Sequence, residues 1–184
     1  MIFYKKINRG FTLVELLVVI SIIATLSTIL FASFNDSREQ ARDKTRMADL
    51  KTLQLAVELY KAQNESYPMP DAGCGVPAGN FAGPGNVFGP VSLSTCTNYI
   101  DGLVPDFIPK LPTDPRFENE NNQGFYYRSD GNSYKIIILD SVETNTVTSY
   151  SDEFARCPST MGSFCPGTAP ANTYGVYNAG AEDW

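Results

Sequence analysis

The sequence predicts an α+β fold in which one long N-terminal α-helix packs against a small antiparallel β-sheet head. A run from Phe11 to Phe34 carries one charge and no glycine or proline, and helical character continues to about Asn64. Strand-like runs separated by turn residues follow only beyond residue 120. We therefore expect a helix of roughly 80 Å whose apolar N-terminal half protrudes from the head.

The apolar run is long enough to cross a membrane as a helix. Its 24 residues span about 36 Å, against about 30 Å for the hydrocarbon core of a bilayer. Its Leu, Ile, Val and Phe side chains favour insertion by about −5 to −9 kcal/mol, against a cost of roughly +3 kcal/mol for one acid. Because Lys5, Lys6 and Arg9 precede the run, the positive-inside rule places the N-terminus in the cytoplasm and the C-terminus outside.

Glu15 is the one charge within this run and needs an explanation, because an acid inside a membrane is costly and usually has a partner. A secretory signal peptide does not fit, because its apolar core is shorter and is followed by a small-residue cleavage site. A plain membrane anchor gives no reason for the acid. A structural alternative is that the N-terminus of the helix itself stabilises the carboxylate.

The N-terminal residues resemble the processing site of type IV pilins and pseudopilins. The matching residues are the basic Lys5, Lys6 and Arg9, followed by Gly10, Phe11, Thr12, Leu13, Val14 and Glu15. The resemblance implies that a prepilin peptidase cuts between Gly10 and Phe11 and methylates the new N-terminus at Phe11. It divides the chain into a leader (residues 1–10), a transmembrane and filament-core helix half (11–34), an amphipathic helix half (35–65) and an extracytoplasmic globular head (66–184).

The resemblance also assigns filament assembly to Phe11, Thr12 and Glu15. Cleavage exposes a positive α-amino group at Phe11, one helical turn from Glu15. In a filament, the carboxylate of an incoming subunit would meet the amine of its neighbour, and charges 4 Å apart attract by about 4 kcal/mol at an effective dielectric of 20. The implied partners are copies of the same chain, a peptidase that also methylates, an inner-membrane platform and a cytoplasmic assembly ATPase.

The charge balance and the missing histidines exclude several functions. The chain has 14 basic and 20 acidic residues, and loss of the leader would leave 11 basic residues and a net charge of −9. Such a surface repels phosphates, so we expect no direct nucleic-acid binding. With no histidine, Ser-His-Asp and Cys-His arrangements are excluded, and no glycine pattern is placed to bind phosphate. We predict that the protein is not an enzyme.

The four cysteines lie in the predicted extracytoplasmic part, where disulfides form. They are Cys74, Cys96, Cys157 and Cys165. Three pairings are open, and the local solution joins Cys74 to Cys96 and Cys157 to Cys165, which closes two loops rich in Gly, Pro or Ser. Because the sequence has no C-x-x-C and no histidine, we predict disulfides and no zinc site.

Two apolar stripes are predicted on the second half of the helix, at spacings of three and four residues. The first comprises Met47, Leu50, Leu53, Val57 and Tyr60, and the second comprises Leu55, Leu59 and Ala62. We expect the first stripe to lie under the head and the second to lie against adjacent helices. Residues 35–46 are charged on all sides of the helix, as expected for a helix that leaves a membrane.

A β-hairpin is predicted in the head. Its strands are Gly124–Arg128 and Ser133–Leu139, on either side of a loop that contains glycine. Apolar residues on both faces of the second strand indicate that it is central and covered on both sides. Weaker strands are predicted at Thr146–Tyr150 and Thr173–Tyr177.

The order of these elements, with Leu-Pro-Thr-Asp-Pro at 111–115 before the first strand, resembles the head of pseudopilins of the G type. Such heads often hold calcium in the loop after these strands. Asp140, Asp152 and Glu153 would supply oxygen ligands, but no regular ligand spacing is present. We therefore expect no cofactor, with calcium as the weaker alternative.

Together these observations predict a structural subunit of a type IV pilus-like filament. The chain would begin as a single-pass precursor in the cytoplasmic membrane and end as a homo-oligomeric extracellular filament. The nearest alternative is a type II secretion pseudopilin. An alternative of another class is a monomeric membrane-anchored binding module.

Overall fold

The computed structural model describes residues 10–71, 74, 81–83, 96, 98–116, 123–144, 147, 149–158, 172–182 and 184, without the side chains of 29–33. The chain divides into two compact units, Met1–Glu39 and Gln40–Trp184, which are described separately. The helix α1 (Leu13–Asn64) runs through both units. The strands β1 (Gly124–Ser129), β2 (Tyr134–Leu139) and β3 (Tyr174–Tyr177) belong to the second.

In the first unit, the described chain from Leu13 onward is the N-terminal half of α1. Its large apolar side chains are exposed, from Leu13 at 78% to Leu26 at 56%. The hydroxyls of Ser21 and Thr25 donate to backbone carbonyls three residues earlier, at 2.7 and 2.9 Å, so they need no outside partner. None of the described helical segments is both long enough and apolar enough to cross a membrane. The span predicted over residues 11–34 is therefore not confirmed.

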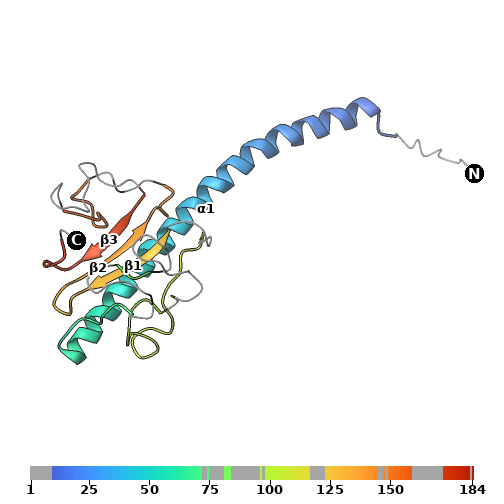
Figure 1. The fold of residues 1–184 in the computed structure, drawn as a ribbon. Helices are drawn as coiled ribbons and strands as arrows, with labels where there is room; N and C mark the ends of the chain where they lie inside the picture. Colours follow the sequence, from blue (N-terminus) through green and yellow to red (C-terminus); the bar gives the residue numbers. More distant parts are fainter. Residues whose placement is uncertain are drawn as a thin grey trace, which may run out of the picture. The chain divides into compact units, whose positions relative to one another are not determined.

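In the second unit, β1, β2 and β3 form an antiparallel sheet with β2 in the centre (Figure 1). Residue Ile136 on β2 lies between Tyr127 on β1 and Val176 on β3. The β1–β2 turn is closed by the Asp130 carboxylate, which accepts a hydrogen bond from Ser133 N at 2.7 Å. The predicted hairpin is confirmed, and the predicted C-terminal strand is β3.

The main core lies between one face of the sheet and the second half of α1. Leu50, Leu53, Ala56 and Val57 of α1 pack with Tyr134, Ile136 and Ile138 of β2 and with Tyr99, Ile100 and Leu103 of the preceding loop. A smaller cluster on the opposite face contains Phe81, Tyr126 and Ile137, with Leu139 and Trp184 against it. Because alternate residues of β2 enter the two clusters, its predicted central position is confirmed.

The stripes of α1 are also as predicted within the second unit. Leu50, Leu53 and Val57 are fully buried, and Met47 and Tyr60 pack at the margin of the same core. Leu55, Leu59 and Ala62 are exposed. The first stripe therefore packs in the core of the head, and the second stripe faces away from the head.

The strand predicted at Thr146–Tyr150 is wrong for its described residues. Val147, Ser149 and Tyr150 lie outside any strand. Ser149 N donates to the Asp152 carboxylate at 2.9 Å, and Asp152 N donates to Ser149 O at 3.2 Å. These local side-chain hydrogen bonds form a turn, which competes with strand pairing.

Candidate functional site

At the start of α1, Thr12 holds the Glu15 carboxylate. Glu15 Oε2 accepts hydrogen bonds from Thr12 N and Thr12 Oγ1, both at 2.9 Å, and Glu15 N donates to Thr12 Oγ1 at 3.2 Å. This reciprocal pair is a capping box, which provides acceptors for N–H groups that the helix leaves unpaired. The Glu15 carboxylate therefore finds its hydrogen-bond donors at the N-terminus of its own helix. This agrees with the structural alternative, in which the helix N-terminus itself stabilises the acid.

The capping role of Thr12 was missed from the sequence, although the signal was present. Thr12 and Glu15 lie three positions apart at the start of a long apolar run, which is the pattern of a capping box. The helix accordingly begins at Leu13 rather than at the predicted Phe11.

The predicted cleavage site is accessible. Gly10 and Phe11 are exposed, Phe11 by 82%, and apart from its chain neighbours no described residue lies within 4 Å of the position that a Cβ of Gly10 would occupy. A peptidase can therefore approach this peptide bond without displacing another described part of the chain. The roles of Gly10, Phe11, Thr12 and Glu15 in processing and assembly stay predictions.

In the head, a buried ionic network centred on Arg46 fastens two loops to α1. The Arg46 side chain is fully buried, and its guanidinium binds Asp114 through Nε and Nη2 at 2.7 and 2.9 Å. Its Nη1 donates to Asp43 at 2.6 Å and to Glu143 at 2.9 Å. Asp114 belongs to the turn before β1 and Glu143 to the loop after β2, so one arginine connects both loops to the helix.

Glu143 is the second centre of this network. Its carboxylate accepts hydrogen bonds from Arg42, at 2.7 Å from Nε, and from Arg116 at 3.0 Å, as well as from Arg46. The hydrogen bond from Arg42 lowers the pKa of Glu143 most, with further lowering by Arg46, to about 2. With Asp43 and Asp114, three carboxylates balance three guanidinium groups, as burial of charge requires.

This network shows that part of the segment 35–46, which is charged on all sides of the helix, is buried in the head. Asp43 and Arg46 are 2% and 0% exposed. The Asp43 carboxylate accepts from Glu143 N at 3.1 Å and from Thr144 N at 2.7 Å. The charged segment is therefore partly core, because loops distant in the sequence supply its partners.

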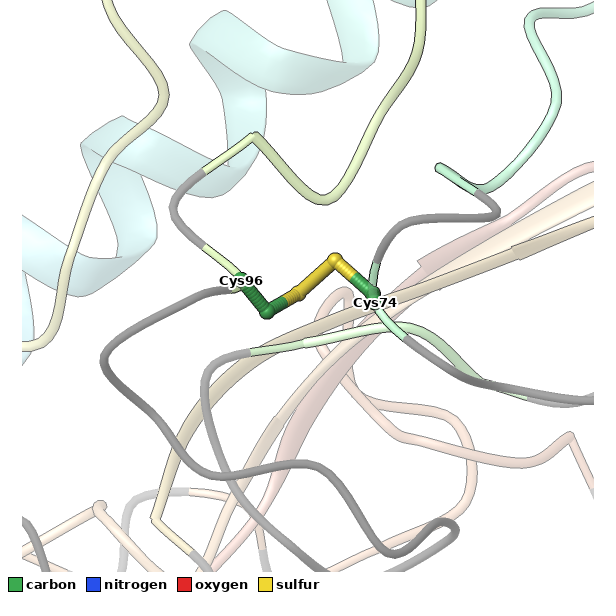
Figure 2. The surroundings of a disulfide bond; sticks show 2 residues. All are labelled: Cys74 and Cys96. Atoms are coloured by element: carbon green, nitrogen blue, oxygen red, sulfur yellow. A yellow bond between two sulfur atoms is a disulfide. The ribbon is translucent and has the colours of Figure 1, made fainter.

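The predicted disulfide between Cys74 and Cys96 is present (Figure 2). It joins residues 22 apart in the sequence, and both cysteines are buried in the main core. Cys157 is also disulfide-bonded, whereas its predicted partner, Cys165, lies outside the described residues. The first disulfide ties part of the long loop after α1 to the core.

The three residues considered for calcium have other environments. Asp152 accepts the hydrogen bond from Ser149 N, and Glu153 forms an ion pair with Lys51 at 2.8 Å. Asp140 follows β2 with a positive φ of 49°. In the described part of the chain, no group of three or more His, Cys, Asp or Glu residues is placed to hold a metal ion. The expectation of no cofactor, with calcium as the weaker alternative, stays a prediction.

Comparison with known proteins identifies the family. Residues 5–31 match the model of the prokaryotic N-terminal methylation motif. Over 108 residues the chain is 31% identical to type II secretion system core protein G of Klebsiella pneumoniae, an alignment that covers 59% of this chain and 69% of that protein. The chain belongs to the type IV pilin and pseudopilin family.

Two further relatives support this assignment to the pilins and pseudopilins. Type II secretion system core protein G of Aeromonas hydrophila is 28% identical over 111 residues, which is 60% of this chain and 69% of that protein. A type IV wide pilus major component of Thermus thermophilus is 41% identical over 59 residues, 32% of this chain and 45% of that protein. No solved structure matches this pilin-like chain.

The fold agrees with the family. The long helix, the small antiparallel sheet and the Cys74–Cys96 disulfide together form an α+β, pilin-like structure. The matched motif contains Gly10, Phe11 and Glu15. Pilins and pseudopilins are structural proteins.

Proposed function

We propose that this protein is the structural subunit of a type IV pilus-like filament, which assembles through α1 after removal of the leader. The match of residues 5–31 to the N-terminal methylation motif carries this proposal. The exposed apolar side chains from Leu13 to Leu26 support it. A helix apolar on all sides is unfavourable in water, and packing against copies of itself removes that surface from water.

Before assembly, the chain is a precursor in the cytoplasmic membrane with its head outside. The apolar run from Phe11 to Phe34 and the three basic residues before it support this orientation. The Cys74–Cys96 disulfide also supports it, because disulfides persist in oxidising compartments outside the cytoplasm. A prepilin peptidase removes residues 1–10 and methylates Phe11, and an inner-membrane platform and an assembly ATPase then add the subunit to the filament.

Glu15 has two successive roles in this proposal. In the precursor, its hydrogen bonds with Thr12 satisfy the carboxylate within one chain. In the filament, the ammonium group of a neighbour's Phe11 adds an opposite charge, and such a pair at 4 Å gains about 4 kcal/mol at an effective dielectric of 20. The capping box lowers the cost of the lone acid, and the charge pair favours assembly.

Mass spectrometry and two variants of Glu15 test this function. The mature protein should lack residues 1–10 and carry a methyl group on Phe11. Glu15→Ala should abolish filaments while membrane insertion is unchanged. Glu15→Gln keeps an acceptor for the capping box but removes the charge, so it should also abolish filaments. Normal filaments from Glu15→Gln would show that capping, and not charge pairing, is the requirement.

A type II secretion pseudopilin is the second candidate function, favoured by the similarity to two core G proteins. The two functions separate in a strain that lacks the chain. Loss of surface filaments with normal protein secretion indicates a pilus subunit, whereas secreted proteins trapped in the periplasm indicate a pseudopilin. A chain that stays monomeric and unprocessed in cells would instead be a membrane-anchored binding module.

A further inference from the structure

The face of the sheet opposite α1, here called the outer face, holds Tyr126 and Ile137. Arg128 on β1 and Lys135 on β2 lie on the same face, because each is two residues away from one of these side chains. The two cations are directly opposite each other in the strand register. Like charges in this arrangement destabilise a sheet, so each needs a compensating contact.

Aromatic rings and backbone oxygens compensate both of these cations. The guanidinium of Arg128 lies 4.3 Å from the centre of the Trp184 ring and 5.8 Å from that of the Phe81 ring, which are cation–π distances. Lys135 Nζ donates hydrogen bonds to the backbone oxygens of Glu182 and Trp184, at 2.9 and 2.8 Å. The contacts that Arg128 and Lys135 need therefore come from their own chain.

A third cation, Arg156, reaches the outer face from the loop before β3. Gly175 is paired with Ile137 in the strand register. A Cβ on Gly175 would lie 3.5 Å from Ile137 Cγ2 and 2.9 Å from Arg156 Cα. The missing side chain of Gly175 therefore leaves the space in which the backbone of Arg156 lies over the sheet.

Arg156 is buried without a partner. The residue is 8% exposed, and no hydrogen bond or ion pair joins its guanidinium to any residue that the structure describes. Its Nε is enclosed, whereas Nη1 and Nη2 are not. Burial lowers the pKa of Arg156, and the charge of the exposed Asp140 opposes this shift without forming an ion pair. Arg156 therefore lacks the compensation that a buried charge requires.

A carboxylate is the group that fits this guanidinium. In the same head, Arg46 binds the Asp114 carboxylate through Nε and Nη2 at 2.7 and 2.9 Å. Because Nε of Arg156 is enclosed, a carboxylate would bind across Nη1 and Nη2, which also form a planar pair of donors. The cations of the outer face favour an anion there, although the chain as a whole has a net charge of −6.

We propose that Arg156 is a binding site for a carboxylate from outside its own chain, which two hydrogen bonds from Nη1 and Nη2 hold on the outer face. The carboxylate belongs either to a small anion in solution or to an acidic side chain of a second copy, and both present the same group. The site is a property of the head and does not depend on the proposed filament function.

Removal of the charge tests whether Arg156 lacks a partner. In Arg156→Met the apolar stem is largely kept and the uncompensated charge is lost, so the full chain in detergent should unfold at a higher temperature than the wild type in sodium chloride. Arg46→Met is the matched control, and it should unfold at a lower temperature because it leaves Asp114 unpaired. A lower unfolding temperature for Arg156→Met would show a partner within the chain and overturn the proposal.

A titration with sodium acetate at pH 7 tests the ligand, with sodium chloride at equal ionic strength as the reference. Acetate at ten times its Kd should raise the folding equilibrium constant of the wild type about elevenfold, and this response should be absent from Arg156→Met. Asp140→Asn removes a competing negative charge and should respond at lower acetate concentrations. A response equal in the wild type and Arg156→Met would overturn the proposal. So would a response seen only in Asp140→Asn, which would identify Asp140 as the partner.

Modification of guanidinium groups by phenylglyoxal, located by peptide mass spectrometry, identifies the source of the carboxylate. In dispersed chains Arg156 should react in chloride and be protected by acetate, while the buried and paired Arg46 should stay unmodified. Protection of Arg156 in filaments without acetate would assign the carboxylate to a second copy, and protection only with acetate would assign it to a small anion. An Arg156 that is unreactive in dispersed chains without acetate would overturn the proposal. Because dispersed chains decide whether the site exists, failure of the site and failure of the filament function are distinguishable.

Discussion

Glu143 shows how one side chain can connect distant parts of this head. It receives hydrogen bonds from Arg42, Arg46 and Arg116, while its backbone N–H donates to Asp43. Removal of one member of a buried ionic network leaves its partners as uncompensated charges, which commonly costs about 3 to 5 kcal/mol. The ionised Glu143 carboxylate therefore helps to hold the loop after β2 in place, together with the hydrogen bonds to Asp43.

We expect the stability of the head to depend on pH through Glu143. Its pKa is lowered from 4.5 to about 2, chiefly by Arg42. A carboxylate with a lowered pKa in the folded state contributes stability that is complete above its unfolded-state pKa and is lost as pH falls toward its folded-state pKa. The free energy of unfolding of the full chain in detergent, measured with urea, should therefore fall between about pH 4.5 and 2.

Glu143→Gln should be less stable than the wild type at pH 7 and should show a shallower decline with acid. Asp101→Asn, which alters an exposed carboxylate, is the matched control and should keep the wild-type slope. An unchanged slope in Glu143→Gln would show that other carboxylates cause the acid sensitivity.

At the scale of elements, α1 performs two tasks on two faces of its second half. Leu50, Leu53 and Val57 are buried under the sheet, whereas Leu55 and Leu59 are exposed. The same residue type therefore contributes to folding on one face and is free to contribute to association on the other.

Leu53→Ala and Leu55→Ala form a matched pair for this division. Leu53 is fully buried, so its truncation should lower the free energy of unfolding by about 2 to 5 kcal/mol. Leu55→Ala should change it by less than about 0.5 kcal/mol but should reduce the amount of filament, because an exposed apolar side chain is lost from the face of α1 that points away from the head. Urea unfolding and the yield of sheared filaments measure the two effects. Equal effects of both variants on stability would contradict the division of faces.

At the scale of the whole molecule, the chain combines a predicted leader (residues 1–10), an apolar helix half and a head that contains the Cys74–Cys96 disulfide. The first compact unit ends at Glu39 and the second begins at Gln40. The leader contributes three basic residues and no acid, so its removal changes the net charge from −6 to −9. The proposed proteolysis would therefore expose a new N-terminus and make the remaining chain more acidic.

A variant with a large residue at the cleavage site should keep the whole molecule as a precursor. Gly10→Leu places a side chain beside the scissile bond, where it crowds the attacking water, so the protein should retain residues 1–10 and form no filaments. Intact-mass measurement of the membrane fraction detects the retained leader. Gly10→Ala, with a much smaller side chain, should still be processed in part. Filaments built from uncut Gly10→Leu would refute the requirement for cleavage.

Local patterns in the sequence were sufficient for α1, the hairpin and β3, but they failed for the strand predicted at Thr146–Tyr150. The three-and-four spacing of Leu50, Leu53 and Val57 predicted the buried face of α1, and apolar residues on both faces of β2 predicted its central place. The motif around Gly10 and Glu15 predicted the family. Such features depend on residues that are close together in the chain, so their periodicity and spacing are visible without a structure.

By itself, the sequence determined the helix, the hairpin, the family and the candidate processing site. Only the tertiary structure decided how the charged residues are paired. Arg46 donates a hydrogen bond to Asp114, 68 residues away in the sequence, and Arg42 donates one to Glu143, 101 residues away. In the linear sequence, nothing distinguishes these residues from charged residues on the solvated surface. Folding brings them together because packing of the sheet on α1 places two loops beside the helix, and burial then requires each charge to have a partner.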